Sequence, residues 1–269
     1  MSGTPGGSSP IDATLVARLD AAAGTARLLV ASDFDGTIAP IVADPEAAQA
    51  DRGALAALRA LVALPATSVA ILSGRSLADL AARTAELDGA LRVGSHGAEF
   101  ERAAVAPLNA EQSALRARIA ERLRAVAARG ARLVLEEKPA SLALHYRNAA
   151  DDVAAAAVAA VLSGPATWPG VVARHGKKVV ELSVVAENKG TALRRIRDDA
   201  AATAAVFLGD DVTDEDAFEV LTSADVGVKV GGGCSRAGHR VTTTDDVVRV
   251  LARLAERRAA LVAACSNER

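Results

Sequence analysis

The chain has 269 residues, which is enough for one large domain or two small ones with a substantial apolar core. Its 31 basic and 33 acidic residues nearly balance, and aromatic residues make up only 2% of the chain. We therefore expect neither a basic stripe nor an aromatic stacking platform, which argues against nucleic acid as a partner.

The N-terminal segment carries no targeting signal. Residues 1–10 are small and polar, without a cationic stretch before an apolar one, so we expect disorder there and no signal peptide. No run of about 18 apolar residues occurs, so no membrane span or membrane partner is expected. Cys234 and Cys265 are too few for a disulfide framework and are expected to be reduced thiols. These features predict a cytoplasmic protein.

Strands and helices alternate in the first third of the chain and again in the last third. Before residue 103 the patterns predict helices at Ile11–Ala23, Glu46–Leu64 and Leu77–Leu87 and strands at Arg27–Ser32, Thr67–Leu72 and Leu91–Gly94. After residue 183 they predict helices at Lys189–Ala200, Asp214–Leu221 and Asp245–Ala264 and strands at Ala205–Leu208 and Val226–Val230. Such alternation is typical of an α/β fold with a parallel sheet covered on both faces.

The middle of the chain has a different pattern. It predicts helices at Glu111–Arg129 and Asp152–Leu162 and two hairpins, with strands at Arg132–Lys138, Ser141–Arg147, Val171–Arg174 and Lys177–Ser183. The second hairpin is expected to turn at His175-Gly176. We therefore predict an α+β domain, residues 103–183, inserted into a core domain made of residues 11–102 and 184–269.

Period-two alternation divides the predicted hairpin strands into two faces. Leucine, valine and tyrosine side chains share one face, and the other carries the charged side chains Glu136, Lys138, His145, Arg147, Lys177 and Glu181. Mixed donors and acceptors of this kind suit a polyhydroxylated sugar. An ordinary solvated face is the alternative that alternation alone favours.

Two carboxylates stand at the end of the first predicted strand, in Asp33-Phe-Asp-Gly-Thr37. Two carboxyl groups this close raise each other's pKa unless a cation lies beside them or the two have different chemical roles. A metal-assisted site with a nucleophilic Asp33 and a proton-transferring Asp35 would resolve the conflict. The alternative is an Asx-rich turn in which Gly36 supplies the positive φ.

Three later segments favour the chemical interpretation. Ser73-Gly74-Arg75 follows a second strand, Lys189 begins a helix whose N–H groups suit an anion, and Asp210 and Asp211 follow a third strand, with Asp214 close behind. In this order the four segments resemble the haloacid dehalogenase (HAD) superfamily of phosphohydrolases. The resemblance implies an α/β fold with a HAD-like Rossmannoid parallel-sheet core and an inserted α+β cap domain of the C2 type.

Further motifs resemble the trehalose-6-phosphate phosphatases within that superfamily. They are Gly94-Ser-His-Gly-Ala-Glu99, Glu136-x-Lys138, His145-Tyr-Arg147, Gly176-Lys-Lys-Val-Val-Glu181 and Gly209-Asp-Asp-Val-Thr-Asp-Glu-Asp216. Two positions depart from the family pattern, since Ser95 stands where Asn is usual and Ser183-Val184 stand where Arg-Pro is usual. The resemblance implies hydrolysis of trehalose 6-phosphate to trehalose and phosphate.

The resemblance also implies roles for individual residues. Asp33 is the expected nucleophile, Asp35 the general acid and base, and Ser73 and Lys189 the groups that hold the phosphate. Mg2+ is the expected cofactor, held by Asp33, the main-chain carbonyl of Asp35 and Asp210, with Asp211 and Asp214 ordering the surroundings. The expected substrate contacts are Gly36, Thr37, Gly74, Arg75, His96, Glu136, Lys138, Arg147, Lys177 and Glu181.

Other functions are compatible with these motifs. One is a phosphatase of the same fold that acts on another phosphosugar, such as a mannosyl- or glucosyl-phosphoglycerate. Another is an inactive sugar-phosphate binder that regulates a trehalose-6-phosphate synthase, the one protein partner the resemblance suggests. The complete set of Asp33, Asp35, Ser73, Lys189 and Asp210 favours an active enzyme.

Overall fold

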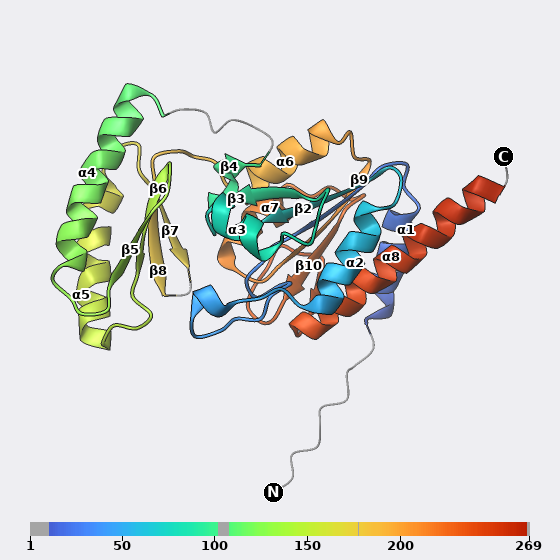
Figure 1. The fold of residues 1–269 in the computed structure, drawn as a ribbon, viewed down its shortest axis with the longest axis horizontal. Helices are drawn as coiled ribbons and strands as arrows, with labels where there is room; N and C mark the ends of the chain where they lie inside the picture. The colour runs from blue at the N-terminus through green and yellow to red at the C-terminus, as the bar shows by residue number, and fades with distance from the viewer. Residues whose placement is uncertain (1–10, 102–107, 177, 268–269) are drawn as a thin grey trace, which may run out of the picture.

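The computed structural model describes residues 11–101, 108–176 and 178–267. In these residues the chain forms two separate sheets, one of seven strands and one of four, which lie side by side in Figure 1. We call the seven-stranded sheet with its helices the larger unit, and α4 through β8, Ala110–Ser183, the smaller unit.

The larger sheet has the strand order β11-β10-β9-β1-β2-β3-β4. All of its neighbouring strands are parallel except β3 and β4, which are antiparallel. Its strands are β1 (Leu28–Ser32), β2 (Thr67–Leu72), β3 (Leu91–Gly94), β4 (Glu99–Phe100), β9 (Ala204–Gly209), β10 (Val226–Val230) and β11 (His239–Val241). The central strand β1 is buried along its whole length, as its apolar run Leu28–Ala31 predicts.

Helices cover both faces of this sheet. One face packs against helices from both ends of the chain, namely α1 (Ala13–Ala23), α2 (Arg52–Val62), α3 (Leu77–Arg83) and α8 (Thr244–Asn267). The other face packs against α6 (Lys189–Asp199) and α7 (Glu215–Glu219). The doubly covered, mostly parallel sheet confirms the predicted α/β core.

The smaller sheet is antiparallel, with the order β5-β6-β8-β7. Its strands are β5 (Val134–Glu137), β6 (Ser141–His145), β7 (Val172–Gly176) and β8 (Val179–Ser183). Helices α4 (Ala110–Ala127) and α5 (Asp151–Leu162) cover the face away from the larger unit (Figure 1), and Leu142, Leu144, Val180 and Leu182 are buried beneath them. The apolar half of the predicted alternation is therefore confirmed.

The prediction of one helix over Glu46–Leu64 is wrong at its start. Residues Pro45–Ala47 form a separate 3₁₀ turn, and α2 begins only at Arg52. The reason is the side chain of Asp51, which caps the helix by accepting hydrogen bonds from the N–H groups of Gly53 and Ala54 at 2.7 and 3.1 Å.

The second hairpin turns later than predicted. Strand β7 continues through His175 and Gly176, and the turn lies between Gly176 and Val179, where Lys178 has a φ of 67°. Lys177 lies outside the described residues, as do the predicted domain boundary at residue 103 and the expected disorder of residues 1–10. The other boundary, after residue 183, coincides with the end of β8.

Two short strands, β4 and β11, were not predicted. They have two and three residues, which is too short for an alternation pattern to show. None of the helices in the described part of the chain combines the length and the apolar character needed to span a bilayer.

Candidate active site

A cavity of about 710 Å³ lies between the carboxyl ends of the larger sheet's strands and the polar face of the smaller sheet. It is lined by most of the predicted site residues, namely Asp33, Asp35, Ser73, Gly74, Arg75, His96, Glu136, Lys138, Arg147, Glu181, Lys189, Asp210 and Asp211. Thr37 and Asp214 are buried, and Gly36 lines a second, smaller cavity together with Asp210. The structure therefore brings together segments that lie far apart in the sequence.

Lys189 lies between two buried carboxylates. Its Nζ donates to Oδ1 of Asp33 and to Oδ1 of Asp214, both at 2.6 Å. Its position follows from the start of α6, where Asn188 and Thr191 form a capping box that places Lys189 in the first helical turn. The two carboxylates raise the pKa of Lys189 far enough to outweigh its burial, so the ammonium stays charged.

The pKa of Asp33 lies well above its ordinary value. Burial is the largest cause, and the carboxylates of Asp214 and Asp210 act in the same direction, while Lys189 opposes them. One lysine thus faces three acids, of which Asp33 and Asp214 are buried and Asp210 is partly buried. Such a site carries an excess of negative charge that a divalent cation would neutralise.

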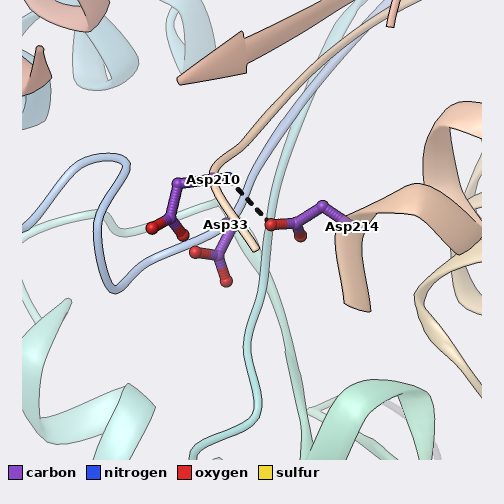
Figure 2. Close-up of side chains that lie close together, drawn as sticks. All are labelled: Asp33, Asp210 and Asp214. Atoms are coloured by element: carbon purple, nitrogen blue, oxygen red, sulfur yellow. Dashed lines mark hydrogen bonds between the residues drawn. The ribbon is translucent and has the colours of Figure 1, made fainter. Parts of the chain in front are cut away.

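The acids converge from separate parts of the chain. Asp33 follows β1, and Asp210 and Asp214 follow β9 (Figure 2). One carboxylate oxygen of each residue lies within 4.8 Å of those of the other two. Hard oxygen donors at this spacing fit a divalent metal ion. Asp214 already accepts from Lys189 and, through Oδ2, from the N–H groups of Asp210 and Asp211 at 2.9 and 2.8 Å. Asp33 and Asp210 are therefore better placed than Asp214 to bind an ion directly.

Gly36 allows Asp210 to approach the turn that follows Asp33. A Cβ atom at Gly36 would lie 2.1 Å from Oδ2 of Asp210, and the φ of Gly36 is +83°. Both observations require glycine there. The hydroxyl of Thr37 lies 3.4 Å from Oδ2 of Asp33, so the same turn also contacts the carboxylate of the predicted nucleophile.

The carboxylate of Asp35 is paired with Arg75. Both of its oxygens accept from Arg75, at 2.7 Å from Nε and 2.6 Å from Nη2. The guanidinium also donates to Asp79 at 2.6 Å and to the carbonyl of Pro45 at 2.8 Å. Arg75 thus lines the cavity as the ion-pair partner of Asp35, an arrangement that the sequence did not predict.

Ser73 and His96 lie at the ends of adjacent strands, β2 and β3. The main-chain oxygen of Ser73 accepts from the N–H of His96 at 2.9 Å. A Cβ at Gly74 would lie 2.5 Å from the His96 ring, so the imidazole packs directly on this glycine. Burial lowers the pKa of His96, which favours a neutral ring at neutral pH. Its Nδ1 is buried and has no hydrogen-bond partner among the described residues.

The smaller sheet places charged side chains against the larger unit. Lys138 donates to Glu181 at 3.1 Å and, across the cavity, to the carbonyl of Gly74 at 2.8 Å. Glu181 lies 3.4 Å from Nε2 of His96. Arg147 donates to the carbonyl of Val42 at 3.0 Å. The charged face is thus turned toward the cavity, which contradicts the alternative of an ordinary solvated face.

Two residues near the site were not singled out in the sequence. Arg174 in β7 lines the cavity and pairs in register with Glu181. Lys229 in β10 is buried and donates to the main-chain carbonyl of Asp210. A lysine inside the otherwise apolar strand Val226–Val230 was a signal that could have found it.

Comparison with protein families gives one match over most of the chain. A family model described as trehalose-phosphatase matches residues 31–245. A trehalose-phosphate phosphatase of Mycobacterium marinum is 38% identical over 240 residues, which are 83% of this chain and 58% of that protein. The chain therefore spans little more than half the length of this curated relative.

Solved structures share the fold. The C-terminal domain of the Candida albicans trehalose-6-phosphate phosphatase has a TM-score of 0.76 at 22% identity, covering 90% of this chain and 96% of that one. An Aspergillus fumigatus trehalose-6-phosphate phosphatase has a TM-score of 0.60 at 26% identity, covering 93% and 99%. The chain thus shares the fold of these structures, in which a HAD-like core of mostly parallel strands is joined to a unit with a second sheet.

Proposed function

The chain belongs to the trehalose-phosphatase family, and on this premise we propose that it hydrolyses trehalose 6-phosphate to trehalose and phosphate. The observation that carries the proposal is the cavity, which has Asp33 and Lys189 at one wall and the charged face of the smaller sheet at the other. The first wall suits a phosphate group, and the second suits a sugar.

In the proposed reaction Asp33 is the nucleophile. An oxygen of its carboxylate forms a bond to phosphorus while the bond from phosphorus to the sugar oxygen breaks, which leaves an aspartyl-phosphate. Water then attacks phosphorus, releases phosphate and restores the carboxylate. The ammonium of Lys189, 2.6 Å from Asp33, stands where it stabilises the phosphoryl oxygens as charge spreads over them.

Asp35 is the proposed proton carrier. It gives a proton to the departing sugar oxygen and then takes one from the attacking water. Both of its oxygens are bound to Arg75 in this structure. Proton transfer therefore requires at least one oxygen to leave the guanidinium, and we propose that the bound substrate loosens this pair.

The proposed cofactor is Mg2+. Asp33, Asp210 and the main-chain carbonyl of Asp35 would hold it, while Asp214 and Asp211 order the loop around them. When bound, the ion neutralises the excess negative charge at the acids and polarises the phosphoryl group. Ser73, Thr37 and the N–H groups near Gly36 and Gly74 complete the proposed phosphate pocket.

The proposed sugar contacts are on the smaller unit, which acts as the cap. Glu136, Lys138, Arg147 and Glu181 lie on the face turned to the cavity, together with the newly found Arg174. Lys177 is proposed from the sequence alone. Buried Nδ1 of His96 offers an acceptor for a sugar hydroxyl. A cytoplasmic location and a link to a trehalose-6-phosphate synthase remain predictions.

A phosphate-release assay with matched substrates tests the proposal. The purified protein is given trehalose 6-phosphate, glucose 6-phosphate, glucosyl-phosphoglycerate and an aryl phosphate, each with and without Mg2+. We expect the highest kcat/KM for trehalose 6-phosphate and no turnover after chelation of the metal. A higher kcat/KM for the phosphoglycerate would make that compound the substrate, and no turnover of any compound would favour a regulatory binder.

A further inference from the structure

A buried lysine lies beside the acidic loop, and no carboxylate among the described residues pairs with it. Lys229 is the fourth residue of β10 and is only 5% exposed. Among the described residues no carboxylate oxygen lies within 4.0 Å of its Nζ. Val226, Val228 and Val230 pack on the face that α1, α2 and α8 cover, so alternation puts Lys229 on the opposite face. A buried ammonium without a carboxylate beside it is costly, so stability alone does not account for its position.

The ammonium of Lys229 instead binds the main chain of Asp210. Its Nζ donates to the carbonyl oxygen of Asp210, and strand register places Lys229 opposite Gly209. From the other side, Oδ2 of Asp214 accepts from the N–H of Asp210 at 2.9 Å. The N–H and the carbonyl of Asp210, which follows the last residue of β9, are thus both hydrogen-bonded to side chains.

The carboxylate of Asp210 lies directly against Gly36, in the turn that follows Asp33. A Cβ at Gly36 would lie 2.1 Å from Oδ2 of Asp210, and one at Gly209 would lie 2.3 Å from Cγ of Asp214. A rotation of the main chain at Asp210 would therefore move its carboxylate into Gly36 or away from it. The hydrogen bond from Lys229 resists that turn.

We propose that Lys229 is a positioning residue that holds Asp210 in the orientation in which it binds the metal ion. The inference rests on the proposed function, because it takes Asp210 as a metal ligand. Orientation of Asp210 by Lys229 and a simple charge effect predict opposite changes in Mg2+ affinity when Lys229 is replaced. Removing a positive charge close to a cation site strengthens cation binding by Coulomb's law, whereas loss of orientation weakens it.

Calorimetric titration with Mg2+ alone, without substrate, separates these effects. The proteins compared are the wild type, Lys229→Met, which removes the ammonium, and Lys229→Gln, which keeps a neutral donor on a shorter stem. We expect Lys229→Met to bind Mg2+ about 10- to 100-fold more weakly, as is usual when a residue that orients a metal ligand is lost. Lys229→Gln should recover part of this loss.

Arg258→Met is the matched control, because it removes a buried cation near the amino end of β2, whereas Asp210 lies at the carboxyl end of β9. It should lower the melting temperature and leave the Mg2+ dissociation constant unchanged. Equal or tighter Mg2+ binding by folded Lys229→Met would overturn the inference while leaving the proposed function intact. Failure of the wild type to bind Mg2+ would overturn the proposed metal site and this inference with it.

Discussion

Asp33 is the residue whose chemistry is most specific to the proposed reaction. We expect Asp33→Asn to lose about 10³-fold or more in kcat, since loss of a nucleophile that acts together with its neighbours has effects of that order. The fold should survive, because an amide is close in size to the buried carboxyl that it replaces. Phosphate release and a thermal melt check this prediction. Near wild-type turnover by the folded variant would remove Asp33 from its proposed role.

Asp35→Asn should act differently on different leaving groups. A sugar alkoxide leaves poorly, so its protonation contributes roughly 10²- to 10⁴-fold to the rate, whereas an aryl oxide leaves with little help. The variant should therefore lose more kcat/KM on trehalose 6-phosphate than on an aryl phosphate. Equal losses on the two substrates would contradict a general-acid role.

Motif order predicted which residues gather at the cavity, because strands of one parallel sheet bring their carboxyl ends to one edge. It could not predict how these side chains pair with one another. The bond from Arg75 to Asp35 depends on which rotamer each adopts once the loops are packed. The contact of Lys229 with Asp210 depends on strand register, which the sequence did not reveal.

Among the secondary-structure elements, α8 is tied to the larger sheet by one buried guanidinium. Arg258 donates to the carbonyls of Ala23, Thr25 and Ala66 at 2.9, 2.5 and 2.9 Å, at the end of α1 and in the loops before β1 and β2. Arg258→Met would remove these hydrogen bonds, although the carbonyl of Ala66 also accepts from the N–H of Leu28 at 3.0 Å. The variant should lower the free energy of unfolding by about 2 kcal/mol. Urea unfolding measures it, with the exposed Arg257→Met as the matched control. Equal stabilities of the two variants would contradict this role.

The contact between β8 and the larger unit should make stability depend on pH. Burial opposes ionisation of Glu181, but His96, Lys138 and Ser141 outweigh it and hold its pKa below the ordinary value of 4.5. A depressed carboxyl pKa stabilises the folded protein above pH 4.5, and this contribution is lost as the pH falls further.

Glu181→Gln should therefore lose less stability than the wild type on acidification. Urea unfolding of both proteins from pH 6 down to about 3, the range in which carboxyl groups titrate, gives the two curves. We expect the difference in unfolding free energy to narrow as the pH decreases. Parallel curves over the whole range would show that Glu181 has no depressed pKa in the folded state.

Long periodic elements were predictable, and short or capped ones were not. The strand over Thr67–Leu72 was predicted to the residue because its apolar run is bounded at both ends. The start of α2 was missed because a cap formed by Asp51 overrides good helix formers upstream. Strand β4 depends on the turn at Ser95 and His96, where both residues have a positive φ that no local pattern reveals.

At the scale of the whole molecule, the two units meet through the side chains that are proposed to bind the sugar. Lys138 and Arg147 donate to carbonyls of Gly74 and Val42 in the larger unit. A bound disaccharide would offer hydroxyl groups in place of these carbonyls. We therefore expect Lys138 and Arg147 to release these carbonyls and bind the sugar when substrate enters, and to bind the carbonyls again when product leaves, as the cap opens and closes.

The central claim is that the face of the smaller sheet turned to the cavity recognises the sugar of trehalose 6-phosphate. Glu136 lies on that face, whereas its neighbour Glu137 contacts Arg116 and Arg124 on α4. Truncation of Glu136 removes hydrogen bonds to the sugar that contribute about 1–3 kcal/mol, which is roughly 5- to 150-fold in kcat/KM. An aryl phosphate has no sugar and should be hydrolysed almost as before.

The most direct test is kcat/KM of Glu136→Ala on trehalose 6-phosphate and on an aryl phosphate, with Glu137→Ala as the matched control. We predict a loss of roughly 5- to 150-fold for Glu136→Ala on the sugar phosphate alone, and no loss for Glu137→Ala on either substrate. Wild-type efficiency of Glu136→Ala on trehalose 6-phosphate, or an equal loss on both substrates, would contradict the claim that this face recognises the sugar.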